Sequence, residues 1–157
     1  MKRSIIISLI FLSACAMNTV SPIITGGDRF TGVKNTRIQL GFSGSHSNIY
    51  FWKFEKQGKV DYAMQYEAFL DNWSFFEKAQ CLVDDQLWQL PEPDKDRQVH
   101  QGYVTEKLMF VMSHSDIEKI AKSRLFEIRF VGRRGITELK FTPEQLQGVK
   151  KFLEKTQ

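Results

Sequence analysis

The side chains best suited to nucleophilic or metal chemistry are few in this chain. Its 157 residues contain two cysteines, Cys15 and Cys81, and three histidines, His46, His100 and His114. The histidines lie in three separate segments, and no H-E-x-x-H pattern places two imidazoles on one helix face. We therefore expect neither a metal site nor a cofactor.

Cys81 is the thiol that could serve as an enzymatic nucleophile, which requires a lowered pKa and partial exposure. It is in phase with Ala79 and Val83, and this alternation favours a buried packing residue. An unpaired cysteine could also form an intermolecular disulfide. Carboxylates in predicted loops offer another route to hydrolysis, and they are Asp84, Asp85, Glu92, Asp94 and Asp96. We expect these to be acidic turns in water, and no catalytic site.

The first residues carry the most specific motif. A positive start, Lys2-Arg3, precedes an apolar run at 5–12 that is too short to span a bilayer. Small residues then come directly before a cysteine, in Leu12-Ser13-Ala14-Cys15. This arrangement resembles the lipobox of bacterial lipoproteins. The resemblance implies that residues 1–14 are a signal peptide that is removed, and that the Cys15 thiol takes a diacylglyceryl group.

The resemblance also implies a location and a class of function. Ala16, rather than aspartate, follows the cysteine, which implies the outer membrane of a Gram-negative bacterium, facing the periplasm. We expect a membrane-anchored periplasmic lipoprotein that acts as a non-catalytic accessory or binding module of the cell envelope. A small envelope hydrolase using Cys81 or the loop carboxylates is one alternative, and a purely structural lipoprotein is the other.

Charge indicates which partners to expect. The chain has 22 basic and 18 acidic residues, and removal of Lys2 and Arg3 with the signal leaves 20 basic residues. Nucleic-acid binders carry basic charge clustered into a footprint, so nucleic acid is not an expected partner of this nearly neutral chain. The expected partners are the membrane, through the lipid anchor, and an envelope protein or glycan.

The elements that must position these residues are mostly strands. Residues 15–27 are small, polar or turn-prone, and they predict a flexible tether behind the lipidated cysteine. Residues 28–157 predict a single domain dominated by period-two alternation of apolar side chains. The segments expected to form strands are 37–42, 49–55, 60–66, 73–83, 87–90, 104–112, 125–131 and 136–141. Residues 91–97 predict a long loop, because proline lacks the donor that a sheet interior requires.

Two helices complete the predicted fold. The short one, near 115–123, begins at Ser115 with Glu118 completing a capping box, or at Ser113, which has the same spacing to Asp116. The second, near 143–155, follows an N-cap Thr142, a proline and a glutamine that completes the box. Because strands and helices do not alternate regularly, we expect an α+β fold with a mainly antiparallel sheet.

Aromatic side chains on two predicted strands could form a binding platform for a glycan, lipid or peptide. They are Tyr50, Trp52, Phe54, Tyr62 and Tyr66. Paired across neighbouring strands, these rings would form an aromatic ladder. The ladder is a platform if it faces solvent and core if it faces the helices, and the core is the favoured interpretation.

Arginines around the predicted turn at 132–135 form the second candidate binding group. They are Arg124, Arg129, Arg133 and Arg134. Arginine makes bidentate contacts, so this group could bind an anionic headgroup or a carboxylate-rich partner. The alternative is a solvated turn whose charges keep a sheet edge from pairing with other chains.

Overall fold

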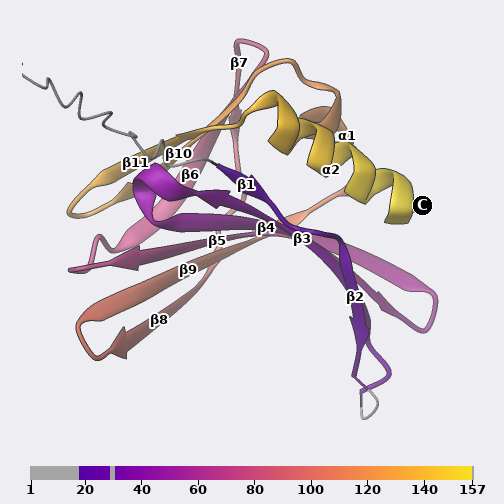
Figure 1. Cartoon of the computed structure of the whole chain (residues 1–157), viewed down its shortest axis with the longest axis horizontal. Helices are drawn as coiled ribbons and strands as arrows, with labels where there is room; N and C mark the ends of the chain where they lie inside the picture. Colours follow the sequence, from indigo (N-terminus) through magenta and orange to yellow (C-terminus); the bar gives the residue numbers. More distant parts are fainter. Residues whose placement is uncertain (1–17, 29–30, 157) are drawn as a thin grey trace, which may run out of the picture.

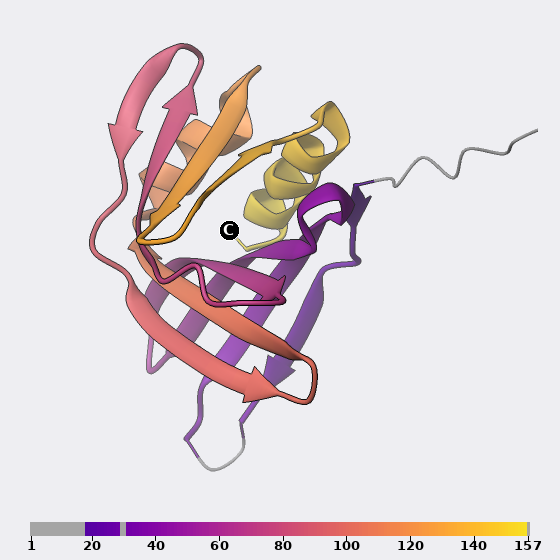
Figure 2. The same ribbon diagram turned by 90° about the vertical axis from the view of Figure 1, so that its left-hand side faces the viewer.

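The structure, a computed structural model, describes residues 18–28 and 31–156. It consists of two antiparallel sheets and two helices, so the predicted α+β class is confirmed, with sheet predominating. Figures 1 and 2 show both helices and the small sheet on one side of the large sheet, and no element of the described residues on its other side. One face of the large sheet therefore packs on the core, and the other is open.

The large sheet has the strand order β1-β3-β4-β5-β9-β8, with β2 also pairing with β3. All of its neighbours are antiparallel. A 3₁₀ turn, η1 (Ser43–Ser45), joins β3 to β4. The strands are β1 (Thr19–Val20), β2 (Ile24–Gly27), β3 (Lys34–Phe42), β4 (Ser47–Lys56), β5 (Lys59–Leu70), β8 (Asp94–His100) and β9 (Tyr103–Met112).

The small sheet has the order β11-β10-β6-β7, and it interrupts the large one in the sequence. The chain leaves the large sheet after β5, forms β6 (Phe76–Val83) and β7 (Gln86–Gln89), and returns for β8 and β9. Strands β10 (Phe126–Gly132) and β11 (Ile136–Lys140) then complete the small sheet, with β10 next to β6. Both sheets thus depend on pairings between distant segments.

The core lies between the two sheets and the helices, and it is rich in aromatic rings. Tyr66 of β5 stacks on Phe130 of β10 with ring centroids 3.7 Å apart, which joins the two sheets directly. Phe76 and Phe110 pack around this pair. The largest fully buried side chains are Tyr66, Phe51, Phe76, Phe110, Phe126, Phe130 and Phe152.

Both helices begin at capping boxes. Helix α1 (His114–Lys122) begins after Ser113, whose Oγ accepts the backbone N–H of Asp116 while the Asp116 carboxylate accepts that of Ser113. Of the two predicted starts, Ser113 is therefore correct. Helix α2 (Pro143–Thr156) begins after Thr142, which exchanges the two expected bonds with Gln145. It lies along the inner face of β3 (Figure 1).

Three segments differ from the sequence prediction. The part of the expected tether that the structure describes contributes β1 and β2, so it is sheet rather than flexible linker. The expected loop at 91–97 contains the start of β8, which is tolerated because the two prolines precede an edge strand. The expected strand at 73–83 begins only at Phe76, since Phe75 adopts a positive φ of 53°.

Candidate functional site

Three aromatic side chains form a row on the open face of the large sheet. Tyr50, Trp52 and Phe54 alternate along β4 and are half-buried, while Ile49 and Phe51 on the other face of the strand are fully buried in the core. The ring centroids of Trp52 and Phe54 are 5.6 Å apart and nearly parallel, and those of Tyr50 and Trp52 are 6.2 Å apart. We call these three residues the aromatic row.

The other two predicted platform residues lie on the opposite face. The register pairs Lys53 with Tyr62 and Ile49 with Tyr66, so both tyrosines of β5 point toward the core. Tyr62 and Tyr66 are accordingly buried. The five aromatic residues of the expected ladder therefore lie on two opposite faces of the sheet. On the open face, Trp52 lies opposite the small side chain of Ala63 on β5 instead of another ring.

Charged and polar groups surround the aromatic row. The Arg37 guanidinium lies over the rings of Trp52 and Tyr50, with its carbon 5.0 and 5.9 Å from their centroids. The Tyr50 hydroxyl donates a 2.8 Å hydrogen bond to Glu67, which also pairs with Lys107 at 3.3 Å. Burial, together with this carboxylate, raises the pKa of Tyr50 to about 12, so the hydroxyl remains a donor.

One donor within the aromatic row is unsatisfied. Among the described residues, the indole Nε1 of Trp52 is buried and has no hydrogen-bond partner. A buried donor without an acceptor costs free energy, typically about 1–3 kcal/mol. The surrounding protein encloses this N–H, so an acceptor on a bound ligand could not reach it unless neighbouring side chains moved.

The structure does not bring the four predicted arginines together. Arg124 precedes β10 and Arg133 follows it, so the length of the strand separates them by roughly 25 Å. Between them, Arg129 forms a 2.6 Å ion pair with Glu138 on the neighbouring strand. The predicted patch is thus reduced to the turn at 132–135.

Within that turn, the two arginines have different surroundings. Arg133 pairs with Glu77 at 2.7 Å, although both side chains remain exposed. The Arg134 guanidinium lies 5.3 Å from the centroid of the Phe75 ring, and Arg134 forms no ion pair within the described part of the chain. One of the adjacent arginines is therefore available to an external anion.

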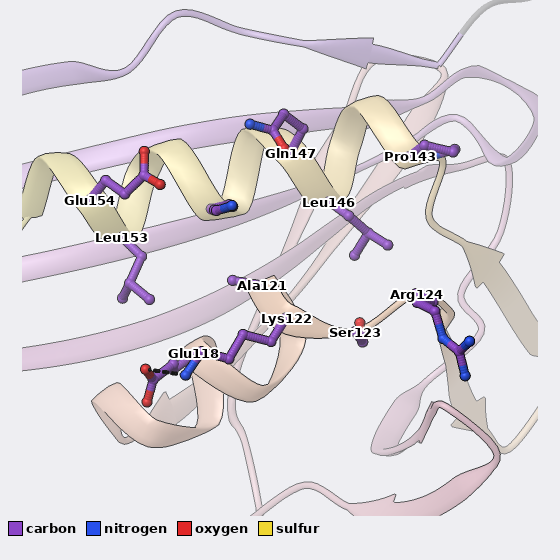
Figure 3. A pocket seen from close by; sticks show the side chains of 11 residues that line it. Glu118, Ala121, Lys122, Ser123, Arg124, Pro143, Leu146, Gln147, Leu153 and Glu154 are labelled. Carbon is purple, nitrogen blue, oxygen red and sulfur yellow. Dashed lines mark hydrogen bonds and ion pairs between the residues drawn. The ribbon is translucent and has the colours of Figure 1, made fainter.

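A cavity of about 650 Å³ lies between the two helices (Figure 3). Leu146 and Leu153 of α2 point toward α1 across it, and Lys122 and Glu118 pair with each other at 2.7 Å on the α1 side. Arg124 lies at its edge. Glu118 and Lys122 neutralise each other, and no charged group lining this cavity is held in the buried geometry of a catalytic acid or base.

Cys81 lacks the environment of a reactive thiol. Its side chain is 1% exposed, and burial raises the pKa of the thiol to about 12. A nucleophilic cysteine requires the opposite shift. Of the loop carboxylates, Asp84 accepts the backbone N–H groups of Leu125 and Arg124, which lowers its pKa and ties two loops together.

The sequence analysis missed one buried carboxylate, Glu106 of β9. Its oxygens accept the backbone N–H groups of Ser74, Phe75 and Phe76 at 2.6, 2.8 and 2.9 Å. The Arg97 Nε lies 3.5 Å from it and is its nearest cation. A glutamate at an inward position of an apolar strand was the available signal. Its role is to hold the chain that crosses from β5 to β6.

In residues 18–28 and 31–156, no group of three or more His, Cys, Asp or Glu side chains could hold a metal ion. Within the same residues, no helix has both the length and the hydrophobicity needed to cross a bilayer. Comparisons of the chain with protein-family models, curated proteins and solved structures gave no match. The predicted signal peptide, residues 1–14, and the predicted lipidation site Cys15 lie outside the described residues.

Proposed function

We propose that this protein is a membrane-anchored periplasmic lipoprotein that binds a glycan of the bacterial cell envelope without catalysing a reaction. Cys15 carries the lipid anchor, in the outer membrane and facing the periplasm. The aromatic row of Tyr50, Trp52 and Phe54 contacts the ligand. The observation that carries this proposal is the position of that row, partly exposed on a sheet face that no described element covers.

A saccharide fits the chemistry of this face. Sugar rings present C–H faces that pack on aromatic rings, and their hydroxyls need both donors and acceptors. The register places Gln39 and Gln65 directly opposite Tyr50, so amides border the row on both sides. Glu67 and Arg37, which contact the row, add an acceptor and a donor.

The absence of a catalytic role is supported by the state of the titratable groups. The Cys81 thiol is buried with a raised pKa, which disfavours the thiolate that an envelope hydrolase would use. On the open face, Glu67 is engaged by Tyr50 and Lys107. These groups are suited to orienting a ligand.

Cosedimentation with purified peptidoglycan sacculi tests the glycan proposal. Trp52→Ala should lower the fraction of protein that sediments, because it removes the central ring of the row. Trp88→Ala is the matched control, since this tryptophan lies on β7 of the small sheet with Lys119 over its ring. Thermal melts establish that both variants fold. Equal sedimentation of wild type and both variants would exclude the aromatic row as the binding site. If the wild-type protein did not sediment, peptidoglycan would be excluded as the ligand.

Mass spectrometry of the mature amino end tests the anchor. The wild-type protein should begin at Cys15 and carry the mass of a diacylglyceryl group. Cys15→Ser should abolish this modification and leave the signal uncleaved by the lipoprotein pathway, because only a thiol accepts the lipid. An unmodified wild-type terminus beginning elsewhere, for example at Met17, would refute the anchor.

A further inference from the structure

The proposed anchor lies very close to the folded domain. The first strand begins at Thr19, so only three residues separate it from Cys15. Even fully extended, this stretch reaches about 14 Å, at about 3.6 Å per residue. The headgroup layer on one side of a bilayer is itself about 5–7 Å thick. A domain attached through Cys15 must therefore lie almost against the membrane.

The position of β1 determines which end of the domain faces the membrane. Thr19 pairs with Gly41 near the end of β3, and it lines a surface hollow together with His46 and Phe69. The η1 turn, the β8–β9 hairpin and the β10–β11 hairpin all lie at this same end, on the left in Figure 1 and toward the viewer in Figure 2. We call this surface the tether end.

Aromatic and aliphatic side chains are exposed at the tether end. Phe69 and Tyr103 are 38% and 41% exposed, and they are the two aromatic residues among the exposed large hydrophobic side chains of the described residues. Their rings lie 6.3 Å apart, and His100 stacks on Tyr103 at 4.6 Å. Val99, which lies next to His100 on β8, is 75% exposed. Tyrosine and other amphipathic rings favour the membrane–water interface.

Basic charge accompanies these apolar groups. The turn at 132–135 lies against the β5–β6 connection, where Arg133 and Arg134 donate their backbone N–H groups to Phe75 and Ser74. Arg134 pairs with no carboxylate of the described chain, so its guanidinium can bind a lipid phosphate. At the opposite end, the β4–β5 turn carries Lys56 and Lys59 but no exposed aromatic ring.

We propose that the tether end docks on the membrane that holds the Cys15 acyl chains, with Phe69, Val99 and Tyr103 among the lipid headgroups and Arg134 at their phosphates. This inference rests on the proposed lipidation of Cys15. It adds a fixed orientation, in which the membrane covers the tether end and the aromatic row, which extends along β4 away from it, remains open to the periplasm.

Two matched label sites test the docking. Val99 and Val111 are 75% and 72% exposed and belong to adjacent strands, but only Val99 lies at the tether end. Each is replaced by cysteine in the full lipidated protein and coupled to a polarity-sensitive fluorophore. Cys81 is too buried to react, and the Cys15 thiol is blocked by its lipid. The protein is then reconstituted into vesicles of phosphatidylethanolamine and phosphatidylglycerol.

The label at position 99 should shift to shorter wavelength and be quenched several-fold more than the label at 111 by lipids that carry a headgroup quencher. A long Gly-Ser insertion before Thr19 should reduce this difference. Equal signals at the two sites, in protein that floats with the vesicles, would overturn the docking and leave the anchor intact. A shift at 99 that requires peptidoglycan instead of lipid would overturn it as well. Failure of the protein to float would refute the anchor itself.

Discussion

Two buried groups with acid–base chemistry, Cys81 and Glu106, stabilise the fold in different ways. Cys81 contributes packing, and its burial keeps the thiol neutral. Glu106 acts as an acceptor for three backbone N–H groups of one turn. Neither touches the open face of the sheet, so substitutions at both sites should change stability rather than ligand binding.

Replacing Cys81 by alanine should destabilise the protein by about 1–2 kcal/mol, because it removes a buried sulfur and its contacts. The pH dependence should also change. Burial raises the pKa of the thiol from its ordinary value of 9.0 to about 12, so its contribution is complete below pH 9 and is lost as the pH rises toward 12.

Urea denaturation at several pH values above 9 measures this effect. The free energy of unfolding should fall more steeply for wild type than for Cys81→Ala, by up to about 1.4 kcal/mol per pH unit. Parallel curves, or rapid reaction of Cys81 with a thiol reagent in the folded protein at neutral pH, would contradict the assigned burial.

Glu106→Gln should destabilise the protein by about 3 kcal/mol or more, because an amide replaces a buried carboxylate that accepts several hydrogen bonds. Urea denaturation measures the loss. Glu77→Gln is the control, since Glu77 is an exposed carboxylate whose partner is Arg133, and exposed ion pairs contribute little. A similar loss in the two variants would show that Glu106 is not the acceptor that holds the β5–β6 connection.

At the scale of the elements, local chemistry was predictable and cross-strand register was not. The cap of α2 follows from residues three positions apart, whereas the same spacing left two starts open for α1. The Cys81 phase follows from its neighbours. The faces of Tyr62 and Tyr66 depend on how β5 aligns with β4, and a shift by one residue would reverse them. No local pattern in the sequence specifies that alignment.

The edge strands were the other part of the fold that the sequence did not predict. Strand β8 lies at an edge of the sheet and carries mostly exposed polar residues, so it lacks the apolar alternation of a central strand. Strands β1 and β2 are short and lie at the other edge, and their composition is that of a linker. In the candidate site, the aromatic row was named from sequence, whereas its separation from the core tyrosines was not.

At Gly132, the β10–β11 turn packs closely against the β5–β6 connection. A Cβ on Gly132 would overlap the carbonyl oxygen of Ser74 and lie 3.0 Å from the Phe75 backbone, which cannot give way as a flexible side chain would. Gly132→Ala should therefore cost more than about 2 kcal/mol. Gly135→Ala is the matched control, because its Cβ would come no closer than 3.8 Å to Ser74. Equal thermal stability of the two variants would contradict this close approach.

At the scale of the whole molecule, the two sheets share one core and should unfold together. Tyr66 of the large sheet stacks on Phe130 of the small one, and Glu106 of the large sheet holds the chain entering β6. A domain of this size commonly unfolds in one transition. Tryptophan fluorescence and far-ultraviolet circular dichroism should give coincident urea transitions. Two separated transitions would show that the small sheet is an independent unit.

The insertion of β6 and β7 between β5 and β9 has a consequence for biogenesis. Tyr62 pairs with Met112 and Val83 with Phe126, so the partner of each early strand is supplied by a much later part of the chain. A polypeptide exported amino end first, as the proposed signal implies, presents β5 and β6 with open edges until translocation is nearly complete. Such edges template aggregation. For the proposed route to the outer membrane, we therefore expect an escort that shields these strands until the last third of the chain arrives.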